Sequence, residues 1–95
     1  MNIQHRSGET KGEFFLEKNG DIKANLTYSK AGESLIILDH TDVSDELKGK
    51  NVGKLLVEHA VTYARENELE VIPLCPFAAS VFKKNKSLQD VLKKQ

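Results

Sequence analysis

The segment between residues 35 and 74 constrains the fold more than any other part of the chain. It opens with four apolar residues, 35–38, a run typical of a central strand that is covered on both faces. From residue 52 to about 67, apolar side chains recur at helical spacing. A second apolar run, 69–74, follows after only a few polar residues. Strand, helix and strand with so short a return predict a parallel β-α-β unit.

The periodicity also assigns side chains to the predicted helix's buried face, which we expect to hold Val52, Leu55, Leu56, His59, Ala60 and Tyr63. His59 is therefore interpreted as part of the core-facing stripe and not as a catalytic residue. The tail predicts helix over 77–85 and 88–92, with Ser87 as the N-cap of the last piece.

The first forty residues predict antiparallel strands. The pair Asn19-Gly20 favours a tight hairpin, because both residues tolerate a positive φ. Residues 22–28 then alternate apolar and polar, the period of a strand with one face on a core. We expect a second turn at Ala31-Gly32, and the central strand is expected to end within 39–42.

Composition narrows the class of protein. Ninety-five residues with 39% hydrophobic and 29% charged side chains predict one folded domain, residues 1–95. A single cysteine, Cys75, forms no internal disulfide, and with no signal peptide or long apolar run we expect a cytoplasmic protein without membrane contact. Three scattered histidines and one cysteine predict no metal site.

The balanced net charge hides a difference between the two halves. Residues 1–47 carry five basic and nine acidic side chains, whereas residues 48–95 carry nine basic and five acidic ones. An anionic ligand would favour the second half. A solvated C-terminal helix ending in Lys93-Lys94 explains the excess equally well. Basic residues are not interleaved with aromatic ones, so we expect no nucleic-acid partner.

A turn rich in glycine and lysine opens directly into the predicted helix. The first turn of a helix leaves backbone N–H groups without partners and carries partial positive charge, which suits a phosphate. Glycine at positions 49 and 53 would let a diphosphate approach the backbone, and Lys48, Lys50 and Lys54 would add charge. Two glycines at this spacing are common, so the pattern alone leaves phosphate binding open.

Residues 43–60, VSDELKGKNVGKLLVEHA, resemble the acetyl-CoA-binding motif of the GNAT N-acetyltransferases. The family motif, Q/R-x-x-G-x-G/A, falls on residues 48–53, with its last glycine at Gly53. Lys48 stands where Gln or Arg is usual, and Asn51 stands where the middle glycine is usual. Since backbone amides do the binding in this family, neither change removes the site.

The resemblance implies a GNAT-like α/β (α+β) fold with a mixed, mainly antiparallel sheet and a central pyrophosphate-binding helix. It implies acetyl-CoA as the cofactor and contacts from eight residues: Val43, Lys48, Gly49, Lys50, Asn51, Val52, Gly53 and Lys54. His40-Thr41 and residues 72–77, IPLCPF, further resemble very small GNAT-like proteins that look like the family's coenzyme-binding core, cut short.

The same resemblance leaves two residues, Cys75 and His40, as candidates for catalysis. Larger relatives often supply a proton to the leaving thiolate from a tyrosine, and this chain has Phe82 at that position and Cys75 at an asparagine position. Cys75 lies between a strand and a helix, where its thiolate is favoured, so it could accept the acetyl group or protonate the leaving thiol. His40 could act as base for the acceptor or polarise Cys75.

Simpler interpretations stay open for both residues. A small buried cysteine can merely pack beside Pro73 and Pro76, and a histidine at a strand end can merely be hydrogen-bonded. The chain is thus expected to be an acetyl-CoA-dependent N-acetyltransferase or a non-catalytic CoA-binding module. An interaction domain without coenzyme is a third possibility. The acceptor is not defined by the sequence, and a monomer is the simplest assumption.

Overall fold

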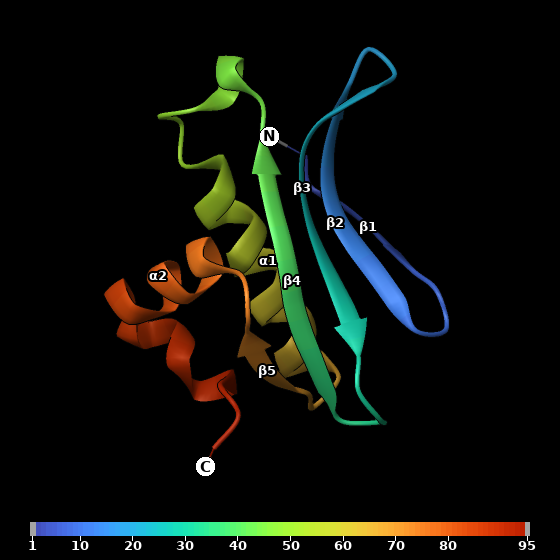
Figure 1. Ribbon diagram of the computed structural model, residues 1–95, viewed down its shortest axis with the longest axis vertical. Coiled ribbons are helices and arrows are strands. Elements are labelled where there is room, and N and C mark those ends of the chain that lie inside the picture. Colours follow the sequence, from blue (N-terminus) through green and yellow to red (C-terminus); the bar gives the residue numbers. More distant parts are fainter. Residues whose placement is uncertain (1, 95) are drawn as a thin grey trace.

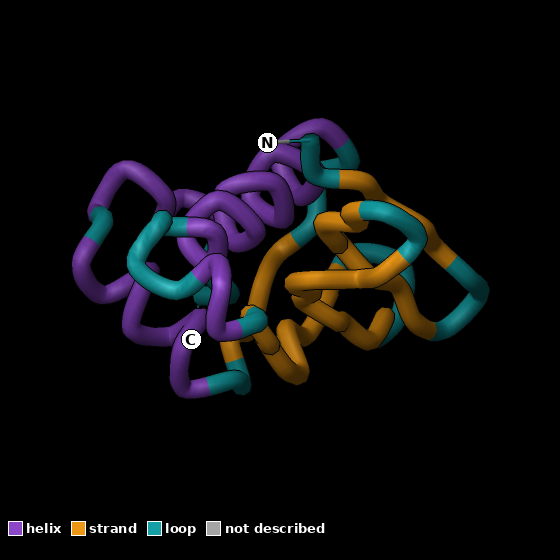
Figure 2. Tube along the Cα trace, turned by 90° about the horizontal axis from the view of Figure 1, so that it is seen from above, coloured by secondary structure: helices purple, strands orange, loops and turns teal. Residues whose placement is uncertain are grey.

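The computed structural model describes residues 2–94, which form a sheet with helices packed against one of its faces (Figure 1). The sheet has five strands in chain order: β1 (Gln4–Ser7), β2 (Lys11–Lys18), β3 (Asp21–Lys30), β4 (Leu35–Val43) and β5 (Glu70–Pro73). The helices are α1 (Val52–Glu66) and α2 (Pro76–Lys84), with the short 3-10 helices η1 (Asp45–Leu47) and η2 (Lys86–Val91). Figure 2 shows the two layers, helices on one side and strands on the other.

The sheet is mixed, as expected. Strands β1 to β4 pair antiparallel, whereas β4 and β5 pair parallel and are joined through α1. The β-α-β unit and the fold class are therefore confirmed. The hairpin is confirmed too, since Asn19 and Gly20 have φ of 53° and 84°, the left-handed conformation that a primed turn requires. Gly32, with φ of 80°, makes the second turn.

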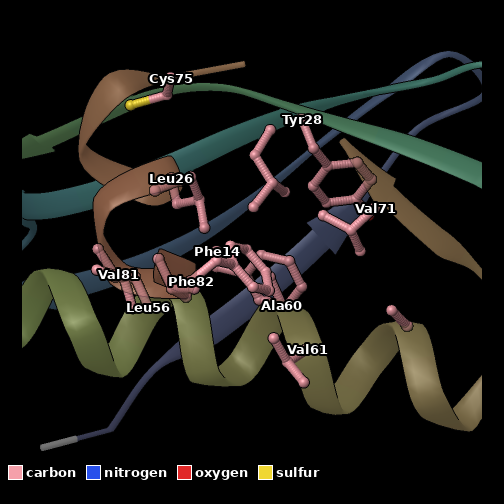
Figure 3. Packing of buried hydrophobic residues seen from close by; sticks show 14 of the residues in the cluster. Phe14, Leu26, Tyr28, Leu56, Ala60, Val61, Val71, Cys75, Val81 and Phe82 are labelled. Atoms are coloured by element: carbon pink, nitrogen blue, oxygen red, sulfur yellow. The ribbon is translucent and has the colours of Figure 1, made fainter. Parts of the chain in front are cut away.

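The core lies between the helices and the inner face of the sheet (Figure 3). Along α1 the buried residues are Val52, Gly53, Leu56, Val57, Ala60, Val61 and Ala64. Val52, Leu56 and Ala60 confirm the predicted stripe, but His59 is exposed and Leu55 only half-buried, so the prediction is wrong along one side of the stripe. Val57 and Val61 are buried as well, because alternating steps of three and four residues along a helix place them on the buried side equally well.

Strand β4 differs from the prediction in two respects: other elements pack on only one of its faces, and it is longer. Ile36 and Leu38 are buried, but their neighbours in the 35–38 run are half-buried, since helices cover only one face of the sheet. The strand also runs on to Val43, because β3 continues to pair with it as far as Ala24.

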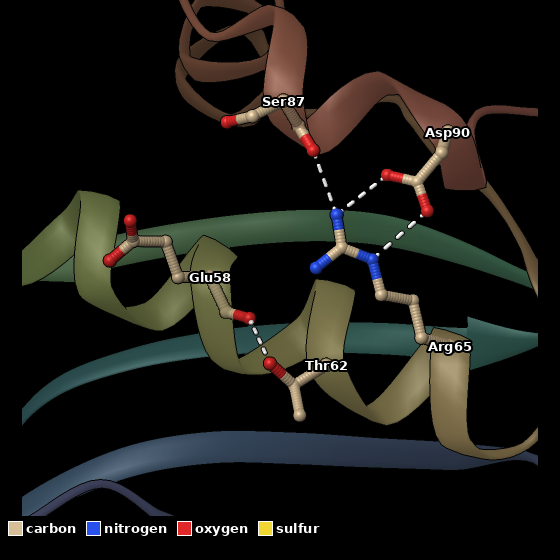
Figure 4. Close-up of polar contacts among 5 residues, drawn as sticks. All are labelled: Glu58, Thr62, Arg65, Ser87 and Asp90. Carbon is tan, nitrogen blue, oxygen red and sulfur yellow. Dashed lines mark hydrogen bonds and ion pairs between the residues drawn. The ribbon is translucent and has the colours of Figure 1, made fainter.

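The C-terminal segment is anchored to α1, as Figure 4 shows, and also to the sheet. The Arg65 guanidinium donates to both carboxylate oxygens of Asp90, at 2.9 and 2.6 Å, and to the carbonyl oxygen of Ser87 at 2.8 Å. Ser87 lies inside η2 and caps nothing, so its predicted N-cap role is wrong. The N–H of Lys93 donates to the Val71 carbonyl at 2.9 Å, which ties the tail to the edge of β5.

One glycine is required by close packing within the sheet. A Cβ on Gly12 would lie 2.2 Å from the ring of Tyr28, its partner on β3. The fully buried Tyr28 ring therefore lies over the glycine, and its hydroxyl comes within 2.6 Å of His5 Nε2. His5 also stacks on Phe14 at 4.1 Å, which fixes β1 to the sheet.

Candidate functional site

A cleft of about 530 Å³ opens at the start of α1. Its walls are residues 41–43 of β4, the loop and first turn of α1 over 47–54, and one face of α2. Seven of the eight cofactor contacts expected from sequence line it: Val43, Lys48, Gly49, Asn51, Val52, Gly53 and Lys54. Lys50 is outside the lining. The predicted residues are thus brought together, although residues on α2 complete the cleft.

The loop before α1 is shaped by two left-handed residues. Gly49 has φ of 83°, and Asn51 has φ of 60° and ψ of 24°. Among residues with a side chain, asparagine tolerates this conformation best, which explains how Asn51 replaces the family's glycine. The Asn51 side chain caps no N–H of α1.

The first turn of α1 therefore presents free donors to the cleft. Within residues 2–94, the backbone N–H groups of Val52, Gly53 and Lys54 have no hydrogen-bond acceptor. Such groups, together with the helix dipole, form an anion-binding site. The side chain of Lys54 adds a positive charge beside them.

Gly53 serves packing between the two helices. A Cβ at this position would lie 2.4 Å from the ring of Phe77, the residue after the first of α2. The missing side chain of Gly53 thus makes room for the Phe77 ring, and not for a phosphate as predicted from the sequence. The backbone N–H of Gly53 is still available to an anion. Sequence reasoning gave Phe77 no role; its only signal was its place just after Cys75 and Pro76.

Strand β4 extends beyond β5, as Figure 1 shows, and its residues 41–43 line the cleft. The parallel pairing ends at Leu38 and Pro73, and Cys75 N–H then donates to the Leu38 carbonyl at 3.0 Å. From residue 39 to 43, the edge of β4 that faces away from β3 has no strand partner within the described chain. An extended ligand with amide groups can hydrogen-bond to such an edge.

Cys75 occupies the N-cap position of α2 and is 6% exposed. Its Sγ lies 3.4 Å from the hydroxyl oxygen of Thr41. Burial raises the pKa of the Cys75 thiol, but hydrogen bonds from the Thr41 hydroxyl and from the N–H groups of Ala78, Phe77 and Thr41 outweigh it. The pKa of Cys75 is therefore lower than usual, and the thiolate is favoured.

His40 lies on the other face of the sheet. Thr41 pairs with the buried Leu26 and so faces the helices, whereas His40 pairs with Thr27 and is exposed. A bulge between the Thr27 and Tyr28 pairs causes this, because simple alternation from Leu38 would have turned His40 inward. The side chain that contacts the Cys75 sulfur is therefore Thr41 and not His40.

Phe82 is buried in the core at 2% exposure and lies beside Leu56 and Val81 in Figure 3. The position at which larger relatives often carry a tyrosine therefore holds a packed aromatic ring. Within residues 2–94, no cluster of three His, Cys, Asp or Glu side chains is arranged to hold a metal, and no helix is long and apolar enough to span a membrane.

Comparison with known proteins identifies the family. Residues 13–91 match the model of the GCN5-related N-acetyl-transferases. The chain belongs to this family. It is 27% identical over 84 residues to Protein NATD1 of Gallus gallus, covering 87% of this chain and 76% of that protein. The human NATD1 is 28% identical over 74 residues, which cover 77% of this chain and 66% of that protein.

Solved structures agree with this assignment. The solution structure of a GCN5-like protein from Staphylococcus aureus is 39% identical and covers 99% of this chain and 91% of that chain, with a TM-score of 0.74. An aminoglycoside N-acetyltransferase solved in complex with CoA superimposes with a TM-score of 0.63 over 99% of this chain and 96% of that chain. Its identity is 9%, so it shows the shared fold.

Proposed function

We propose that this protein uses acetyl-CoA to acetylate an amine-bearing acceptor. The single observation that carries the proposal is the set of free N–H groups at Val52, Gly53 and Lys54, which open onto the cleft beside Lys54. These donors fit the diphosphate of the coenzyme. The amide-bearing arm of the coenzyme then follows the unpaired edge of β4 over 39–43 toward Cys75.

Transfer requires a neutral amine to attack the thioester carbonyl and a proton for the departing CoA thiolate. Cys75 serves in one of two ways. As an acid, its thiol gives its proton to the CoA sulfur as the C–S bond breaks. As a nucleophile, its thiolate forms a new thioester with the acetyl carbon, and CoA leaves as a thiolate that takes a proton from water. The neutral amine then attacks the carbonyl carbon of this thioester, the Cys75 thiolate leaves, and the nitrogen of the new amide loses a proton to water. Thr41 stabilises the thiolate in both routes.

His40 keeps one of its two expected roles. Because it faces the side of the sheet away from the helices, we propose that it accepts a proton from an acceptor amine that approaches from that side. It does not act through Cys75.

A second function, coenzyme binding without transfer, is favoured by the buried Phe82, which has no proton to give. The two functions separate when the protein is incubated with acetyl-CoA and both thiol release and intact mass are followed, for wild type and Cys75→Ala. An acetyl group on Cys75, or thiol release that depends on an added amine and falls in Cys75→Ala, supports transfer. Saturable binding with neither result contradicts transfer and supports the binding module.

A further inference from the structure

The cleft has a second polar wall, on α2, that lies outside the family motif. Ser80 and Lys84 are four residues apart in α2, so they share one face of the helix, and both line the cleft. The adjacent Lys83 does not line it. The Asn85 side chain, also at this wall, already donates to the Val81 carbonyl at 2.7 Å. Ser80 and Lys84 are thus the donors of this wall that remain available to a ligand.

Positive charge enters the cleft from both walls. Lys48 is compensated, since its Nζ lies 3.0 Å from Asp45 Oδ1. Lys54 on α1 and Lys84 on α2 form no ion pair within residues 2–94. Two positive charges that face one cleft repel each other, and a ligand with two separate anionic groups can neutralise both of them.

Coenzyme A carries two such groups, the diphosphate and the 3′-phosphate of its ribose. The free N–H groups of α1 and Lys54 account for the diphosphate. We propose that Ser80 and Lys84 bind the 3′-phosphate and make the protein select CoA thioesters over acyl carriers that lack this group. This inference rests on the proposed function and adds to it the specificity for the donor.

Calorimetric titration with CoA and with 3′-dephospho-CoA tests the inference. A charged hydrogen bond of ordinary strength gives wild type about a tenfold preference for CoA. In Lys84→Gln the affinity for CoA falls to that for 3′-dephospho-CoA, which itself is unchanged. Lys83→Gln is the matched control, with the same charge change one residue away, and it keeps the wild-type preference.

Equal affinity of wild type for the two ligands overturns the inference. An equal loss of the preference for CoA in Lys83→Gln and Lys84→Gln also overturns it, because the preference then depends on the overall positive charge and not on a specific contact of Lys84. Failure of wild type to bind either ligand contradicts the proposed function instead. Ser80→Ala provides a second variant if Lys84→Gln does not fold, and it is expected to lower the preference with no change in binding of 3′-dephospho-CoA.

Discussion

Replacement of Asn51 by alanine tests whether the left-handed turn before α1 is a costly conformation that asparagine makes tolerable. Asn51 has φ of 60° and ψ of 24°. In this region the Cβ of an ordinary residue crowds the following carbonyl, at a cost of about 1–2 kcal/mol, and asparagine escapes part of that cost. The side chain makes no cap hydrogen bond, so its removal loses no such contact. We therefore expect Asn51→Ala to lower the free energy of unfolding by about 1 kcal/mol.

Urea denaturation followed by circular dichroism measures this change, and a destabilisation of about 1 kcal/mol corresponds to a fall of roughly 4–8 °C in Tm for a domain of this size. Asn51→Gly is expected to be at least as stable as wild type, because glycine adopts the conformation without strain. Lys50→Ala, in the same loop at a residue with negative φ, should change stability by less than about 0.5 kcal/mol. Equal stability of Asn51→Ala and Asn51→Gly would show that the left-handed conformation at residue 51 carries no cost for alanine.

Three further results are expected. Gly12→Ala should destabilise by about 2 kcal/mol in a urea titration, because its Cβ would lie 2.2 Å from the buried Tyr28 ring, and a neutral result contradicts that packing. Burial and the Lys30 ammonium lower the pKa of His5 in the folded protein. The contribution of neutral His5 to the free energy of unfolding is therefore complete above about pH 6.5, the pKa of an unfolded histidine, and is lost as pH falls through the lower folded pKa. His5→Gln should flatten the dependence of stability on pH in this range, and an unchanged pH profile contradicts the shift. Thr41→Val should raise the pKa of Cys75 and slow its alkylation by iodoacetamide at neutral pH, whereas an unchanged pH profile of alkylation rules out that hydrogen bond.

The sequence was sufficient for those parts of the fold that depend on local periodicity and turn chemistry. Asn19-Gly20 makes its hairpin because both residues accept positive φ, and the β-α-β unit follows from two apolar runs around an amphipathic helix. The loop over 48–53 lies where the motif predicted, since a strand end and a helix start leave it little freedom.

The site was harder to predict where distant segments meet. The bulge that turns His40 away from the helices depends on pairing between β3 and β4, and no local pattern in either strand announces it. The place of the Phe77 ring over Gly53 depends on how α2 packs on α1, a contact between residues 24 positions apart. Ser80 and Lys84 line the cleft because of the same packing of α2 on α1. In the sequence alone they are ordinary residues of an amphipathic tail.

In the mechanism proposed above, the unpartnered N–H groups at the start of α1 hold the diphosphate of the coenzyme. The most direct measurement is a titration of ¹⁵N-labelled protein with CoA, followed through the amide signals of Val52, Gly53 and Lys54. We expect large, saturable shifts at these three residues and along residues 39–43 of β4, with little change in β1. Saturable binding that leaves the three amides unshifted would contradict it.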